Sequence, residues 1–161
     1  MTSTAITAVE KRLMEAGLSS AESFIGCTEE EVINIESRFA IRLPQCYRDF
    51  LAAMGRDAGK FLVGTDYSYP KMLEFRKEAE GLVRACQSSF SLPTTSYVFM
   101  FHQGYTFLFF DCQGSVDPSV FMFTEAEREP RKTSESFSEW LLAAAEDDIA
   151  AYRELEDLRG S

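Results

Sequence analysis

The sequence has one histidine, one tryptophan and no long apolar run. A membrane-spanning helix needs roughly 20 consecutive apolar residues, and every apolar stretch here is interrupted well before that length. The first residues, MTSTAITAVEKRLMEAG, also lack the charged start and apolar run that are typical of a signal peptide. We therefore expect no membrane contact and a cytoplasmic location.

Cysteine is scarce, and its spacing is irregular. No pair of cysteines forms a C-x-x-C motif, which argues against a zinc site. In a reducing compartment the thiols are expected to stay free and to serve as small apolar side chains. The cysteines are Cys27, Cys46, Cys86 and Cys112. We predict no metal and no cofactor.

Positively charged residues are also few compared with negatively charged ones. The chain of 161 residues has 16 Lys and Arg against 26 Asp and Glu, a formal net charge of −10. Binding to nucleic acid relies on cations that displace counterions from phosphates, so direct nucleic-acid binding is not expected. An acidic surface attracts basic protein partners, although the same charge is also common in proteins where it serves solubility alone.

Aromatic and other apolar residues are plentiful, and their period predicts helices in the first half of the chain. Apolar residues make up 45% of the sequence, including 14 Phe. Helical spacing predicts an N-terminal helix over about 4–16, and Thr28 with Glu31 has the spacing of a capping box at the start of another. Two further helices are expected after Pro44 and after Pro70.

The period then changes from 3.6 to 2, which predicts strands. The runs YVFMFH and YTFLFF are separated by Gln103-Gly104, the length of a two-residue hairpin that would pair His102 with Tyr105, Met100 with Phe107 and Val98 with Phe109. A third strand is expected over 119–124 and a closing helix over about 136–157. KFLVGTDYSYP suggests a short strand and a polar loop, and EAEREPRKTSES a charged loop. Helices around an antiparallel sheet define an α+β fold, here one domain over 1–161.

His102 is the natural candidate for catalysis, and geometry argues against it. In the predicted hairpin, Cys112 and Asp111 lie beyond the end opposite His102, on the order of 20 Å away along the strand. A Cys–His pair or a serine triad built from these residues would need hydrogen-bond contact. A partner elsewhere in the chain stays open. We predict no catalytic residues and no enzyme activity.

The order of these segments resembles the SMI1/KNR4 family of the SUKH superfamily over about residues 28–142. The resemblance rests on three groups of residues. They are Leu43-Pro44 with Tyr47, Phe50, Leu51 and Gly55; then His102-Gln103-Gly104-Tyr105; then Phe137, Trp140 and Leu141. It implies an α+β fold without known catalytic activity. Bacterial members are similar to immunity proteins that neutralise a cognate toxin, often a nuclease, and fungal members act as regulatory hubs.

We therefore predict a non-enzymatic protein-binding domain, either an immunity protein against a basic toxin domain or a regulatory adaptor without a toxin partner, as monomer or homodimer. Interface hot spots favour tyrosine, and acidic loop residues suit a basic partner. The predicted contacts are polar loop residues close to aromatics: Asp57, Asp66, Tyr67, Tyr69, Gln113 and Asp117.

Overall fold

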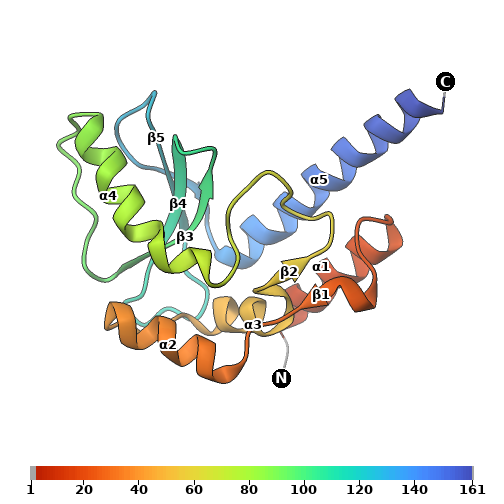
Figure 1. Cartoon of the computed structure of the whole chain (residues 1–161), viewed down its shortest axis with the longest axis horizontal. Helices are drawn as coiled ribbons and strands as arrows, with labels where there is room; N and C mark the ends of the chain where they lie inside the picture. Colours follow the sequence, from red (N-terminus) through yellow and green to blue (C-terminus); the bar gives the residue numbers. More distant parts are fainter. Residues whose placement is uncertain (1–2, 161) are drawn as a thin grey trace.

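The computed structural model describes residues 3–160, and the predicted α+β class is confirmed (Figure 1). A four-stranded antiparallel sheet in the order β3-β4-β5-β6 is flanked by helices, and a short two-stranded sheet pairs β1 with β2. The helices are α1 (Thr4–Glu15), α2 (Glu29–Phe39), α3 (Gln45–Met54), α4 (Phe75–Ala85) and α5 (Phe137–Arg159), with short 3₁₀ helices η1 (Ala21–Ser23) and η2 (Lys71–Glu74). The strands are β1 (Phe24–Ile25), β2 (Asp57–Ala58), β3 (Ser96–His102), β4 (Thr106–Asp111), β5 (Val120–Thr124) and β6 (Arg131–Ser134).

The first and last helices, α1 and α5, pack against each other. In α1 the apolar side chains of Ile6, Val9 and Leu13 are buried, as their spacing predicts. Arg12 of α1 donates two hydrogen bonds to the carboxylate of Glu146 of α5, at 2.7 and 2.9 Å. The expected bounds of both helices are correct to within two residues. α5 then continues outward, away from the sheet (Figure 1).

The middle helices start where their capping signals predict. Thr28 and Glu31 form a complete capping box at the start of α2, which satisfies two N–H groups that lack partners in the helix. Pro44 precedes α3, as expected, and α3 buries one apolar stripe at helical spacing. The buried residues at that spacing are Tyr47, Phe50, Leu51 and Met54.

The sheet is covered on both faces by aromatic side chains from helices. On one face α4 lies against β3, and the ring of Phe75 approaches that of Phe101 with centroids 6.1 Å apart. On the other face Tyr47 of α3 packs against Phe110 of β4, with ring centroids 5.2 Å apart. Trp140 of α5 packs against Phe99 of β3, with ring centroids 5.1 Å apart. The phenylalanine-rich hairpin therefore forms the centre of the core.

The predicted register of the hairpin is wrong at its tip. Gln103 and Gly104 do form the turn, both with positive φ, and the N–H of Tyr105 donates to the carbonyl of His102. His102 nevertheless pairs with Thr106, and Met100 with Leu108 rather than Phe107. A β-bulge between Val98 and Met100 absorbs the extra residue and restores the predicted pair Val98–Phe109.

Two further assignments need correction. KFLV at 60–63 forms turns rather than a strand, because Leu62 takes a left-handed φ of 60° that a strand excludes. The charged segment after β5 contains β6, which pairs with β5 at the sheet edge. The sequence of β6, RKTS, has no apolar alternation because its residues are exposed or only half-buried. An edge strand of this kind lacks the pattern by which strands are recognised.

Candidate functional site

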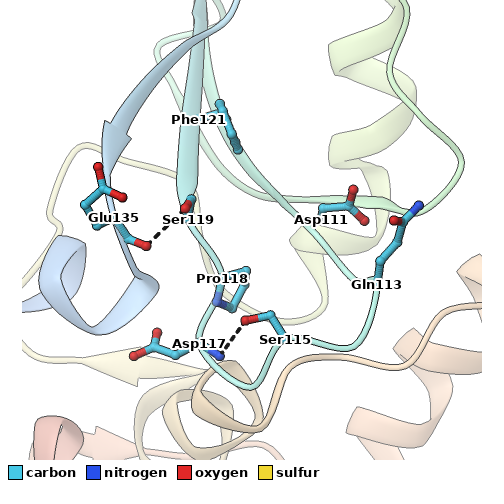
Figure 2. A pocket seen from close by; sticks show the side chains of 8 residues that line it. All are labelled: Asp111, Gln113, Ser115, Asp117, Pro118, Ser119, Phe121 and Glu135. Carbon is cyan, nitrogen blue, oxygen red and sulfur yellow. Dashed lines mark hydrogen bonds between the residues drawn. The ribbon is translucent and has the colours of Figure 1, made fainter.

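An open groove lies between the β4–β5 loop and the end of β6, and it contains two of the six predicted contact residues (Figure 2). Its volume is about 450 Å³. In Figure 2, Asp111 and Gln113 lie on one side, Asp117 and Glu135 on the other, and Pro118 and Phe121 between them. The groove is lined by Asp111, Gln113, Ser115, Asp117, Pro118, Ser119, Phe121 and Glu135. We call these eight residues the acidic groove, because its lining has three carboxylates and no cation.

Asp111 is the carboxylate of the groove with an unsatisfied oxygen. Its Oδ1 atom is buried and has no hydrogen-bond partner within residues 3–160. Asp111 ends β4, opposite Ser96 of β3, so its position is fixed by the sheet ladder. A buried carboxylate oxygen without a donor loses hydration and gains no bond in return. Because Oδ1 is buried, an incoming N–H group would reach it only after the Asp111 side chain rotates toward the groove.

The other two carboxylates are already engaged inside the chain. Asp117 Oδ1 accepts a hydrogen bond of 2.9 Å from the N–H of Ser138 in the first turn of α5. The charge of Asp117 also raises the pKa of Cys46, a shift whose largest cause is burial of the thiol. Glu135 binds Lys132 at 2.7 Å. Asp117 thus anchors the loop to α5, while Glu135 adds a charge that is partly neutralised.

Gln113 is exposed at the mouth of the groove. Its Nε2 donates a 3.3 Å hydrogen bond to Thr95 Oγ1, and its amide oxygen has no hydrogen-bond partner within the described chain. Ser115 Oγ accepts from the N–H of Asp117 at 3.2 Å, and Ser119 Oγ donates to the carbonyl of Glu135 at 3.0 Å (Figure 2). These bonds fix the shape of the loop that forms the groove.

The remaining predicted contacts lie between α3 and η2, and they do not line the groove. Asp57 is exposed and its Oδ1 accepts from the N–H of Gly59 at 2.9 Å. Asp66 is half-buried, binds Lys71 at 2.8 Å and exchanges two backbone hydrogen bonds with Phe101 of β3. The side-chain hydrogen bond between Lys71 and the Asp66 carboxylate raises the pKa of Lys71. Tyr67 is only 8% exposed and belongs to the core; burial raises its pKa well above the ordinary value.

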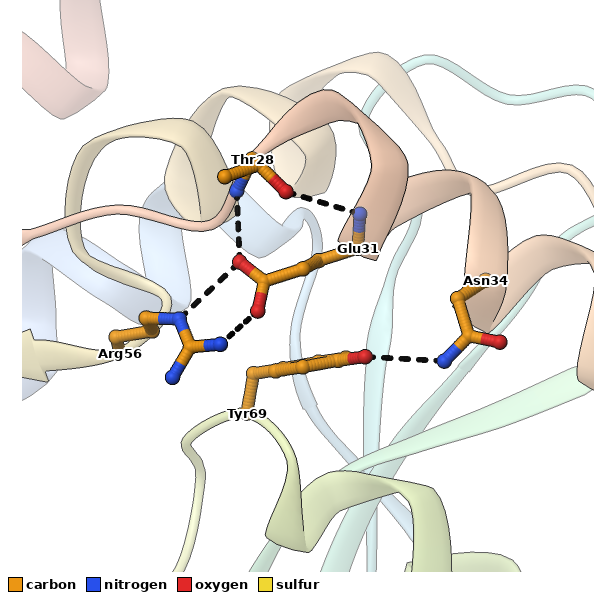
Figure 3. Close-up of polar contacts among 5 residues, drawn as sticks. All are labelled: Thr28, Glu31, Asn34, Arg56 and Tyr69. Carbon is orange, nitrogen blue, oxygen red and sulfur yellow. Dashed lines mark hydrogen bonds and ion pairs between the residues drawn. The ribbon is translucent and has the colours of Figure 1, made fainter.

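Tyr69 is part of a polar cluster that joins α2 to the segment after α3 (Figure 3). Its hydroxyl accepts from Asn34 Nδ2 at 3.0 Å, and the guanidinium of Arg56 lies 5.1 Å from the ring centroid. Arg56 also forms a two-pronged ion pair with Glu31, which at the same time closes the capping box of α2. Tyr69 therefore has a defined structural role as well as a half-buried surface.

Cys112 and His102, the candidate nucleophile and base, lie far from each other, as the predicted hairpin requires. His102 lies at the hairpin tip, whereas the N–H of Cys112 donates to the carbonyl of Thr95 beyond the other end of β3. Burial, followed by the charge of Asp111, raises the pKa of Cys112 to about 12. Burial likewise raises the pKa of Cys27 to about 11. Both thiols are therefore protonated at neutral pH.

Metal-binding geometry and membrane-spanning helices are both absent from the described part of the chain. Within residues 3–160 no group of three or more His, Cys, Asp or Glu side chains is placed to hold a metal ion. Over the same residues no helix has the length and apolar content needed to cross a bilayer. All four cysteines are free.

Sequence reasoning missed most of the groove lining. It considered Asp111 only as a partner for His102 and did not consider Phe121 or Glu135 as site residues. These residues come from different strands and meet only once β4, β5 and β6 have paired. The signal available in the sequence was the acidic residue that ends an aromatic strand, in FLFFD at 107–111.

Comparison with known proteins gives one family. The model of the SMI1 / KNR4 family (SUKH-1) matches residues 26–143. A search of curated proteins finds no match. The match begins directly after β1 and ends in the first turns of α5. It includes the helix after Pro44, the hairpin and Trp140, which are the segments on which the resemblance was based. The chain belongs to the SMI1/KNR4 family.

Proposed function

We propose that the chain is a non-enzymatic protein-binding domain that acts in the cytoplasm as an immunity protein and neutralises a cognate toxin domain with a basic surface. Membership of the SMI1/KNR4 family supports a protein-binding role. The net charge of −10 supports a basic partner, since complementary charge speeds encounter between proteins.

The observation that carries the proposal is the unsatisfied oxygen of Asp111 in the acidic groove. Once the half-buried Asp111 side chain rotates toward the groove, a guanidinium or ammonium group from the partner would supply the missing donor in a charge-assisted hydrogen bond. The flanking residues suit such a group, because Gln113 offers a free amide oxygen and Phe121 is a half-buried ring. Arginine both hydrogen-bonds carboxylates and stacks on aromatic faces. In a nuclease, the same cations would otherwise bind phosphate.

Among the other predicted contacts, Asp57 and Asp66 lie at the surface and extend the acidic character beyond the groove. Tyr69 is half-buried and Tyr67 is buried, so we propose Tyr69 as an accessory contact and assign Tyr67 to the core.

The test is protection of cells. The chain is co-expressed with the toxin domain encoded beside its gene, and survival is compared for the wild type, Asp111→Asn and the matched control Asp147→Asn. Asp147 is an exposed residue further along α5. Asp111→Asn keeps the shape and removes the charge, and it should weaken binding of the purified toxin domain at least about tenfold, as at an interface hot spot. Asp147→Asn should behave as the wild type.

Three outcomes would contradict the proposal or part of it. Failure of the wild type to protect against any toxin encoded nearby would favour the adaptor role. Loss of protection in His102→Ala with unchanged toxin binding would indicate chemistry rather than binding. If the wild type protects and Asp111→Asn protects equally well, the groove is not the contact surface.

A further inference from the structure

A second concave site opens on the opposite face of the sheet from the acidic groove. Neighbouring residues of a strand point to opposite faces, so Met122 faces away from the groove residue Phe121. Met122 lines a pocket of about 400 Å³ at the hairpin tip. We call it the apolar pocket. The residues that matter here are Met100, His102, Tyr105, Leu108, Met122 and Trp140.

The pocket exists because α5 covers only part of this sheet face. The Trp140 ring packs edge-on against Phe99, 5.1 Å between centroids, and the helix then runs away from the sheet (Figure 1). Met122 and Trp140 consequently remain half-buried, and Tyr105 is 41% exposed. His102 lies edge-on to Tyr105, with ring centroids 5.8 Å apart, and forms the rim.

The lining is suited to a bulky apolar group. The volume falls within the range of roughly 300–1,000 Å³ typical of ligand pockets. Methionine side chains adapt their shape to a partner, and Trp and Tyr are among the residues most enriched at binding hot spots. No lining residue is a carboxylate, a cation or a thiol. The lining therefore offers apolar contact area to a bound group and few charges.

Acidic side chains flank the pocket in the chain. Glu125 is exposed, and its N–H donates to the carbonyl of Tyr105 at 3.0 Å. Glu139 is exposed and precedes Trp140. Neither carboxylate has an ion-pair partner within residues 3–160.

Two cations that neighbour lining residues, Arg131 and Lys71, are already in ion pairs. Arg131 lies opposite Met122 in the β5–β6 pair and binds Glu127 at 3.2 Å. Lys71 binds Asp66, which follows the lining residue Thr65, at 2.8 Å. The segments next to Tyr105 and Trp140 thus carry carboxylates without an ion-pair partner in the described chain, which favours cations on either side of an apolar insert.

We propose that the apolar pocket binds a bulky apolar side chain of the protein partner, flanked by Lys or Arg. The proposal rests on the proposed function in one respect, that the partner is a protein with a basic surface. It adds a second contact on a different face of the sheet, which would make the partner enclose the sheet edge at β6.

Trp140 is the chain's only tryptophan, so its fluorescence reports on this pocket directly. The probe is the peptide acetyl-Lys-Arg-Phe-Leu-Arg-Lys-amide, titrated into the full chain. Two control peptides replace Phe-Leu by Ser-Gly, or replace every cation by Glu. The basic apolar peptide should shift the Trp140 emission, and each control should bind at least about tenfold more weakly.

Two variants locate the binding. Met122→Arg places a cation in the pocket, and Tyr105→Ala removes an exposed ring without disturbing the core. Met122→Arg should weaken peptide binding at least about tenfold and Tyr105→Ala several-fold. Ile33→Arg is the matched control, because Ile33 is 50% exposed on α2 and does not line the pocket. Thermal unfolding establishes that each variant is folded.

The proposal is overturned if the basic apolar peptide leaves the Trp140 emission unchanged at millimolar concentration, or if folded Met122→Arg and Tyr105→Ala bind it as the wild type does. Because the peptide titration needs no toxin, its outcome is independent of the protection assay. A wild type that protects cells but ignores the peptide would refute the pocket alone.

Discussion

Two glycine-to-alanine substitutions should change stability in opposite directions. Gly26 lies between β1 and α2, where an added Cβ would approach the carbonyl oxygen of Ala52 in α3 to 1.8 Å. That atom belongs to a helix backbone and cannot rotate away. Gly81 lies inside α4, and the nearest atom to an added Cβ is the mobile end of Arg84 at 4.0 Å.

The magnitudes follow from these surroundings. Overpacking a close contact costs about 1–3 kcal/mol. The shift would also stretch the 2.7 Å hydrogen bond from the N–H of Cys27 to the carbonyl of Leu51, which contributes about 1 kcal/mol. Gly26→Ala should thus cost about 3 kcal/mol. Gly81→Ala should gain about 0.5–1 kcal/mol, because alanine restricts the unfolded chain and favours helix.

The assay is thermal unfolding followed by circular dichroism at 222 nm. For a chain of this size about 1 kcal/mol corresponds to roughly 2–4 °C in Tm. We expect Gly26→Ala to lower Tm by about 6–12 °C and Gly81→Ala to raise it by about 1–4 °C. Equal Tm values for Gly26→Ala and the wild type would refute the close packing of the β1–α2 connection on α3.

Three further measurements test the electrostatic and chemical account. The association rate with the toxin domain should fall at least about tenfold between 50 and 500 mM salt, because steering by the net charge is screened; a rate independent of salt would contradict it. Burial raises the pKa of Asp148, so the folded state keeps this proton to higher pH than the unfolded chain, and ionisation lowers stability as pH rises through that window. Asp148→Asn keeps an acceptor for the N–H of Leu62 and should raise Tm at pH 7 but not at pH 3, whereas a lower Tm at pH 7 would show that the charge itself is needed. Cys27 and Cys112, with pKa values raised to about 11 and about 12, should react with iodoacetamide at pH 8 at least about 100-fold more slowly than free cysteine, and fast labelling of either in the folded chain would refute their protonated state.

Local signals in the sequence predict the helices well. The capping box of Thr28 and Glu31 fixes the start of α2, and Pro44 precedes α3 as expected. These signals succeed because each depends on atoms within one turn of the chain.

Strand register is harder to predict because it depends on distant partners. The bulge between Val98 and Met100 has no local signal, yet it moves every pair at the hairpin tip by one residue. The polar strand β6 exists because β5 offers it an edge, so its own composition does not reveal it.

The candidate site was likewise predictable only where it depends on residues close together in the sequence. Gln113 and Asp117 share one loop, and polar loop residues near aromatics are recognisable in sequence. Asp111, Phe121 and Glu135 complete the acidic groove only through pairing of β4, β5 and β6. Charge balance indicated a basic partner, but only the three-dimensional arrangement identifies the unsatisfied oxygen of Asp111.

The most direct test of protein binding through the acidic groove is hydrogen–deuterium exchange of the chain with and without its purified toxin domain. Binding there should slow exchange in the segments 111–121 and 131–138, which form the groove and the start of α5. Protection confined to α1 and the outer half of α5, with unchanged exchange in the groove segments, would contradict the account.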